Sequence, residues 1–156
     1  MNDDEIISSE EFIKFSEAVV TFLTFQLHNV SKSYELRNIS IYDDLKDDWV
    51  IGYIFGWTNY LYQLSGFKDF ENGFFYILYG IYSKWKISGL ENYSEHKDFF
   101  LNIEKKIDNK NNTLFEGFVV GYKDIEHNHK RKERKDNGMK ISLQRFLMKK
   151  IKTPKV

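Results

Sequence analysis

Apolar residues recur every three or four positions along most of the chain. The first stripe of this kind contains Phe12, Phe15, Val19, Phe22 and Val30. This spacing is typical of an amphipathic helix that buries one face. Ser8 and Glu11 have the spacing of a capping box, in which the serine oxygen accepts a free backbone N–H at the start of a helix. We therefore predict a first helix from Ser8 to about Ser33.

Similar stripes predict four more helices and a short closing one. The expected ranges are 47–64, 69–87, 94–107 and 139–151, and a further helix begins at 113 and continues into residues 123–135. The fifth helix is expected to open with a capping box formed by Thr113 and Glu116. The segment "RNISIY", residues 37–42, is a weak strand candidate, and no stretch alternates long enough to support a sheet. We expect an all-α, single-domain bundle of about five to six helices with an aromatic-rich core.

A six-residue pattern occurs twice, as "GYIFGW" from Gly52 and as "GFVVGY" from Gly117, 65 residues apart. Each copy places two glycines one turn apart on the same helix face. A glycine inside a helix costs about 1 kcal/mol relative to alanine, so these positions need a compensating reason. Close approach of a second helix supplies that reason, and we predict that the second and fifth helices cross here. A ligand pocket is an alternative, and duplication into two related helical hairpins is another interpretation of the repeat.

Composition excludes several classes of protein. The 156 residues are 42% hydrophobic and 17% aromatic, and they include no cysteine, which excludes disulfides, thiolate metal sites and a cysteine nucleophile. The acidic start has no apolar segment of the kind that a secretory signal needs. The longest apolar run, residues 49–64, contains polar side chains and is too short for a membrane span. We expect a soluble, cytoplasmic protein that does not enter a membrane.

Charge is unevenly placed although the net charge is zero. Residues 1–104 contain 17 acidic and 8 basic side chains, whereas residues 105–156 contain 6 acidic and 15 basic ones. We expect a helical core domain over residues 1–136 and a basic amphipathic helix and tail over residues 137–156. Such asymmetry indicates a partner of opposite charge, which could also be the acidic part of the same chain.

The acidic segment "DDLKDD", residues 43–48, is the leading candidate for a partner-binding surface. Asp47 or Asp48 is expected to cap the second helix, and carboxylates can also contact a basic protein. Aromatic side chains beside them are typical anchors of a protein interface. The predicted contact residues are Tyr42, Asp43, Asp44, Asp47, Asp48, Glu91, Tyr93 and Glu95.

Two other sets of residues support alternative sites. A basic set could bind nucleic acid through its phosphates; it comprises Lys130, Arg131, Lys132, Arg134, Lys135, Arg145, Lys149 and Lys150. A second set, Asp124, Glu126, His127 and His129, has side chains that ligate metals. Di-iron bundles need two Glu-x-x-His motifs and further carboxylates, and this chain has a single such motif at Glu126 and His129.

No motif of catalysis or cofactor binding accompanies these residues. The chain has no phosphate-binding glycine loop and no nucleophile elbow, which favours a non-enzymatic role without a cofactor. The hypothesis is a small intracellular inhibitor of the toxin-immunity or counter-defence kind, which covers a protein partner such as a basic nuclease or toxin. Nucleic-acid association and a helical metal- or ligand-binding bundle are the alternatives. A homodimer formed through the last helix is compatible with each.

Overall fold

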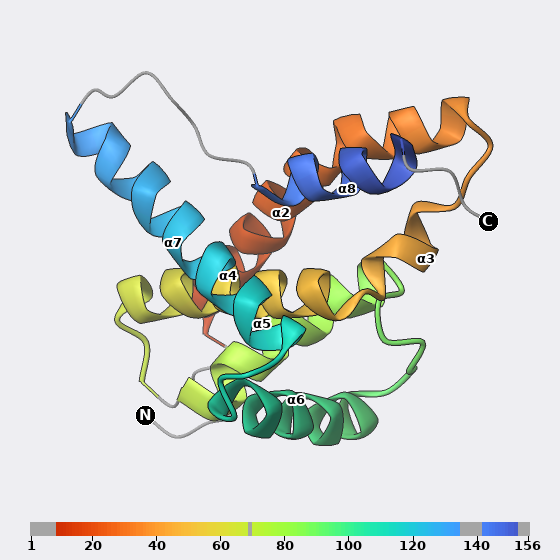
Figure 1. The fold of residues 1–156 in the computed structure, drawn as a ribbon. Helices are drawn as coiled ribbons and strands as arrows, with labels where there is room; N and C mark the ends of the chain where they lie inside the picture. Colours follow the sequence, from red (N-terminus) through yellow and green to blue (C-terminus); the bar gives the residue numbers. More distant parts are fainter. Residues whose placement is uncertain (1–8, 69, 135–141, 153–156) are drawn as a thin grey trace.

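The computed structural model describes residues 9–68, 70–134 and 142–152, which form seven helices and no strand (Figure 1). The helices are α2 Glu10–Leu36, α3 Ile41–Leu45, α4 Asp48–Ser65, α5 Phe70–Lys84, α6 Tyr93–Asp108, α7 Thr113–Arg134 and α8 Ser142–Lys152. The prediction of an all-α, single-domain bundle is therefore confirmed. The short α3 lies in the connection that follows the first long helix.

Polar side chains cap the first long helices, in one case not at the expected residue. Helix α2 begins after Ser9, whose side chain accepts the N–H of Phe12 at 3.2 Å, whereas the expected cap Ser8 lies outside the described residues. Asp47 caps α4, as expected, by accepting the N–H of Trp49 at 2.9 Å. Each cap satisfies a backbone donor that has no partner within its own helix.

Asparagine residues cap the two later helices, which corrects the predicted start of α6 and the predicted cap of α7. Asn92 accepts the N–H of Glu95 at 2.9 Å and starts α6 ahead of the expected Ser94. Asn112 accepts the N–H of Phe115 at 2.8 Å, so it performs the capping role expected of Thr113. Asparagine is one of the strongest capping residues, and it competes successfully with a neighbouring serine or threonine.

The segment proposed as a weak strand is not one. Helix α2 continues past the expected end at Ser33 because Tyr34 is buried on its inner face, and Asn38 then turns the chain with φ at 55°. Ile41 opens α3, and both Ile41 and Leu45 are buried. Two apolar residues four positions apart fit one turn of helix as well as a strand edge, and packing against the core selects the helix.

Helices α4 and α7 cross near the centre of the molecule, as the repeated glycines predicted (Figure 1). A Cβ atom added to Gly52 would lie closer than 3.0 Å to the backbone of Leu114, and one added to Gly117 would crowd the backbone of Trp49. The two helices are therefore in direct backbone contact, which a side chain at either glycine would prevent. This contact positions every other helix around it.

Aromatic side chains fill the interior around this crossing. The ring of Phe55 meets that of Phe74 edge-on at 5.0 Å, and Phe100 packs against Phe75 at 5.4 Å and Tyr82 at 5.2 Å. All five side chains are at most 2% exposed. Edge-to-face contacts of this kind add stability beyond the area that the rings bury.

Helix α8 belongs to the same core, although it is rich in lysine. It lies beside the second half of α2 (Figure 1), and its residues Leu143, Leu147 and Ile151 are buried. The predicted amphipathic helix is therefore present, with its apolar face against the bundle. Residues 137–141 and 153–156 of the predicted basic segment lie outside the described residues.

Candidate binding surface

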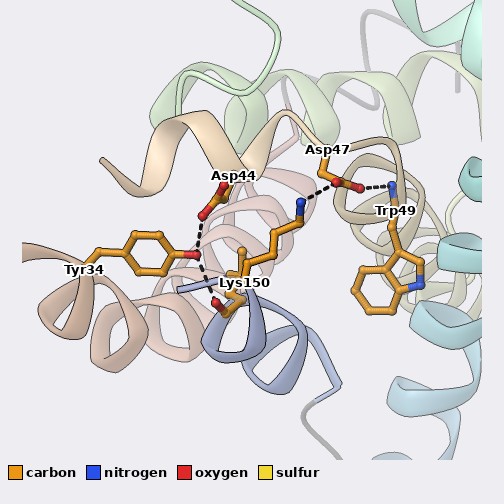
Figure 2. Close-up of polar contacts among 6 residues, drawn as sticks. Tyr34, Asp44, Asp47, Trp49 and Lys150 are labelled. Carbon is orange, nitrogen blue, oxygen red and sulfur yellow. Dashed lines mark hydrogen bonds and ion pairs between the residues drawn. The ribbon is translucent and has the colours of Figure 1, made fainter. Parts of the chain in front are cut away.

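The aspartates of residues 43–48 divide into two inward-facing and two outward-facing side chains. Asp44 is 7% exposed, and its Oδ2 accepts a hydrogen bond from the Tyr34 hydroxyl at 2.7 Å (Figure 2). The same hydroxyl lies 3.0 Å from the carbonyl oxygen of Leu147 on α8. Asp44 thus joins α2, α3 and α8, and it is not presented to a partner.

Asp47 is also engaged within the chain. One of its oxygens accepts the N–H of Trp49, and the other lies 2.7 Å from Nζ of Lys150 on α8 (Figure 2). Both members of this ion pair are about one-third exposed or less. The pair therefore connects the start of α4 to α8, and it occupies a carboxylate and a lysine that the sequence assigned to two different surfaces.

Tyr42, Asp43 and Asp48 remain on the surface of this segment. The Tyr42 ring is 37% exposed and lies 6.5 Å from the ring of Trp85, while Nζ of Lys86 stands 5.4 Å over it. These contacts connect α3 with the connection between α5 and α6. Tyr42 is therefore held in place while it stays accessible.

The other predicted contact residues lie where α6 begins. Glu91 is exposed, and its backbone carbonyl is 3.5 Å from the Tyr79 hydroxyl. The Tyr93 ring packs edge-on against Tyr79 at 5.4 Å. Glu95 is exposed in the first turn of α6, where Asn92 donates to its carboxylate at 2.6 Å. Figure 1 places this region and α3 along the same side of the molecule.

The basic set is spread over two helices. Lys130 on α7 pairs with Glu126 at 3.8 Å, and Lys150 on α8 pairs with Asp47. Arg145 and Lys149 are exposed on α8. The side chains of Arg131, Lys132 and Arg134, and the whole of Lys135, lie outside the described residues. A nucleic-acid interface over these helices stays a prediction.

The described residues contain no group of three histidine or acidic side chains that could hold a metal ion. Asp124 is 4% exposed and turns inward, where it accepts hydrogen bonds from the Tyr53 hydroxyl at 2.8 Å and from the N–H of Ser142 at 2.9 Å. Glu126 pairs with Lys130, and the ring of His129 lies 6.2 Å from that of Tyr60. Asp124 therefore anchors the start of α8 instead of joining the outer side chains.

The fold brings together a serine and a histidine that no sequence motif pairs. Ser88 Oγ lies 2.7 Å from Nε2 of His96, whose Nδ1 donates to the carbonyl of Asn92 at 2.8 Å. This tautomer leaves Nε2 as an acceptor, the arrangement of a base beside a nucleophile. However, the His96 side chain is 0% exposed, and Ser88 Oγ also accepts the N–H of Leu90. The pair therefore holds the connection between α5 and α6 in shape.

Burial affects the titration of several groups away from the surface carboxylates. It raises the pKa of Tyr34, Tyr53 and Tyr82, and the adjacent carboxylates of Asp44 and Asp124 reinforce the effect on the first two. These hydroxyls therefore stay protonated and act as donors. Partial burial likewise raises the pKa of Glu104, with smaller contributions from nearby acidic side chains.

No described helix combines the length and apolar character that crossing a membrane requires. No family model, curated protein or solved structure matches the chain. The assignment of a function therefore depends on the surface itself.

Proposed function

We propose that the protein is a non-enzymatic binding protein, an inhibitor or neutralising protein that acts through an acidic surface with an aromatic centre. This surface, which we call the acidic face, comprises Tyr42, Asp43, Asp48, Glu91 and Glu95. Support comes from one observation above all: these four carboxylates are exposed, and α3, the start of α4 and the connection into α6, which carry them, lie along one side of the molecule (Figure 1). Tyr42 is held by Trp85 and Lys86 but remains accessible, as an anchor residue should be.

The chemistry of this face favours a basic partner. Exposed carboxylates that are spaced along a surface attract a cationic protein over a distance and discriminate against acidic ones. A nuclease or toxin that uses lysine and arginine side chains to hold phosphates presents such a surface. Covering that surface would inhibit the partner without any catalytic residue on this chain.

The test is a combined charge reversal, Asp43→Lys, Asp48→Lys, Glu91→Lys and Glu95→Lys, with capture of the partner from the native cell. We expect the tagged wild type to retain a basic protein and this variant to bind it at least tenfold more weakly. Asp44 and Asp47 are left intact because they hold α8, so their replacement would confuse lost binding with lost structure.

A matched control reverses four exposed acidic residues elsewhere, Glu11, Glu17, Glu35 and Glu116. The control variant changes the net charge by the same amount as the acidic-face variant. At physiological salt, separated surface charges are screened, so the control should bind the partner with an affinity close to that of the wild type. Equal binding by the wild type and the acidic-face variant would refute the proposal.

A further inference from the structure

The crossing of α4 and α7 is reciprocal. Gly52 on α4 faces the carbonyl of Leu114 on α7, and Gly117 on α7 faces the carbonyl of Trp49 on α4. Gly117 lies 65 positions after Gly52, and Leu114 lies 65 positions after Trp49. Adding 65 to the α4 residue of one contact and subtracting 65 from its α7 residue therefore gives the two residues of the other contact. Such a self-complementary arrangement is the signature of a two-fold axis between two like surfaces.

The second pair of glycines obeys the same rule. Gly56 faces the carbonyl of Phe118, and Gly121 faces the carbonyl of Tyr53, again with an offset of 65 between equivalent residues. Because residue numbers rise together on both helices, α4 and α7 run parallel, as helices do when a two-fold axis runs alongside both of them. Asp47 and Asn112, which cap these helices, differ by 65 as well.

The correspondence extends to the outer helices. The Gln144 side chain on α8 donates to the carbonyl of Gln26 on α2. The equivalent positions in the other half are Tyr79 on α5 and Glu91 just before α6, and there the Tyr79 hydroxyl lies 3.5 Å from the Glu91 carbonyl. Thus α8 contacts α2 as α5 contacts α6, so the last helix of each half touches the first helix of the other half.

A second pair of equivalent contacts joins the same helices. The Tyr34 hydroxyl on α2 lies 3.0 Å from the carbonyl of Leu147 on α8. The positions related by 65 are Phe99 on α6 and Tyr82 on α5, whose rings lie 6.2 Å apart. One contact is between a hydroxyl and a carbonyl and the other is between two rings, but equivalent positions meet in both halves.

Identical residues also recur 65 positions apart in the sequence. The identical pairs at or after the first glycine are Gly52 and Gly117, Gly56 and Gly121, Asn72 and Asn137, Gly73 and Gly138, Leu78 and Leu143, and Lys84 and Lys149. Both Leu78 and Leu143 are 0% exposed. No insertion or deletion interrupts the offset of 65 between residues 52–84 and residues 117–149, and equivalent contacts follow the same offset. Such agreement is difficult to obtain by convergence of helix patterns alone.

We infer that the chain is a fused dimer of one three-helix unit, and that its halves can pair with the complementary halves of a second copy. The first unit is α2, α4 and α5, and the second is α6, α7 and α8. In a closed chain the two units pair with each other, while in an exchanged dimer the first unit of one copy pairs with the second unit of another. This inference does not depend on the proposed function.

Charge determines which halves pair. Residues 1–88 carry 13 acidic and 7 basic side chains, a balance of −6, whereas residues 89–156 carry 10 acidic and 16 basic ones, a balance of +6. Two first halves would repel each other, and a first half attracts a second half. Within one chain the short connection, residues 85–92, keeps the halves at high effective concentration, so the closed form dominates at low protein concentration.

The test uses two full-length variants with different tags. One carries Gly52→Ala and Gly56→Ala, and the other carries Gly117→Ala and Gly121→Ala. Each variant alone should lose its helical circular dichroism because the added methyl groups collide with the facing backbone. The two variants are then unfolded together at high concentration and refolded. They should form a mixed dimer in which one lobe, a first half paired with a second half, contains no mutated helix. Helical signal per chain should return to about half of the wild-type value, and both tags should be recovered together.

The matched control refolds two differently tagged copies of the same variant, Gly52→Ala with Gly56→Ala. No intact lobe can form from these chains, so no rescue is expected. Absence of rescue in the mixed sample would overturn the inference. Variants that fold alone as well as the wild type would also overturn it, because the crossing would then not be what joins the halves.

Discussion

At the scale of single residues, two buried tyrosine–aspartate pairs join distant parts of the chain. Tyr34 donates to Asp44 and Tyr53 donates to Asp124, and both carboxylates are less than 10% exposed. Each pair also reaches a backbone group of α8, at Leu147 and Ser142. A buried carboxylate is costly unless donors surround it, so each tyrosine hydroxyl stabilises the position of the last helix.

Replacing Tyr53 by phenylalanine tests this role. The Tyr53→Phe variant should lose about 1.5–3 kcal/mol of unfolding free energy, because a hydrogen bond to a buried charged acceptor is removed. Urea unfolding measures the loss, and amide hydrogen exchange should increase first in α8. The control Tyr76→Phe, on a side chain that is 39% exposed, should change stability by less than about 0.5 kcal/mol. Equal effects from the two substitutions would contradict the assigned role.

Glu104 supports a prediction about pH. Its pKa is raised in the folded protein by partial burial and by the nearby acids Glu71 and Asp108, so the folded state binds this proton more tightly than the unfolded state. The stabilisation that this provides is present below the unfolded pKa and is lost as pH rises through the folded pKa.

The variant Glu104→Gln should therefore be more stable than the wild type at pH 7, by less than about 0.5 kcal/mol because solvent screens a partly exposed group. Thermal unfolding at pH 7 and at pH 3.5 measures the difference, which should disappear at the lower pH. Asp98→Asn, on an exposed residue of the same helix, is the control. A Glu104→Gln advantage that persists unchanged at pH 3.5 would show that charge is not its cause.

At the scale of helices, the crossing of α4 and α7 determines the arrangement of the others. Four glycines let the two backbones touch, and aromatic residues beside them, among them Tyr53 and Phe55, fill the space around the contact. The cost of glycine in a helix, about 1 kcal/mol at each position, is offset by packing that a larger residue would prevent.

Alanine at one of these positions should damage the fold, and alanine at another helical glycine should not. In Gly52→Ala the new Cβ would lie closer than 3.0 Å to the Leu114 carbonyl, so we expect a loss of about 3 kcal/mol or more. In Gly80→Ala the nearest atom is a Val20 methyl carbon at 3.5 Å, an ordinary contact. That control should gain up to about 1 kcal/mol from helix propensity. Chemical denaturation measures both, and a Gly52→Ala variant as stable as Gly80→Ala would exclude a close backbone contact.

At the scale of the whole molecule, the last helix completes a core that the first helix begins. Helix α8 contributes buried leucines beside α2, places its Leu147 carbonyl 3.0 Å from the Tyr34 hydroxyl and pairs its Lys150 with Asp47. The core therefore depends on residues from both ends of the described chain. We expect such a bundle to unfold as one cooperative unit.

Buried tyrosines predict how that unit responds to alkali. Burial raises the pKa of Tyr34, Tyr53 and Tyr82 above the ordinary value of 10.0, so the unfolded state loses these protons first. Their contribution to stability is complete below pH 10 and falls by about 4 kcal/mol per pH unit above it. A molecule of ordinary stability should then unfold between about pH 11 and 13.

Absorbance at 295 nm, recorded together with circular dichroism, tests this expectation. Exposed tyrosines should ionise first, and the buried ones should ionise only as the helical signal is lost. Ionisation of all 10 tyrosines in one smooth phase with the helices intact would contradict it.

Sequence alone determined the helical class, the approximate helix ranges and the crossing of α4 and α7. These features follow from spacing along the chain, because residues three or four positions apart share one face of a helix. The stripe of Phe12, Phe15 and Val19 and the pairs of glycines one turn apart both have this spacing. The caps of α2, α6 and α7 were missed by one or two residues, because neighbouring polar side chains have similar capping strength, whereas Asp47 caps α4 as expected.

Only the tertiary structure decided which charged residues are available to a partner. Asp43 and Asp44 are adjacent and chemically identical, yet one is exposed and the other accepts a hydrogen bond from Tyr34 in a site that Leu147 completes. The partners of Asp44, Asp47 and Asp124 lie up to 103 positions away in the sequence. Periodicity is local and can be read along the chain, whereas the burial of a charge depends on which distant helix is folded against it.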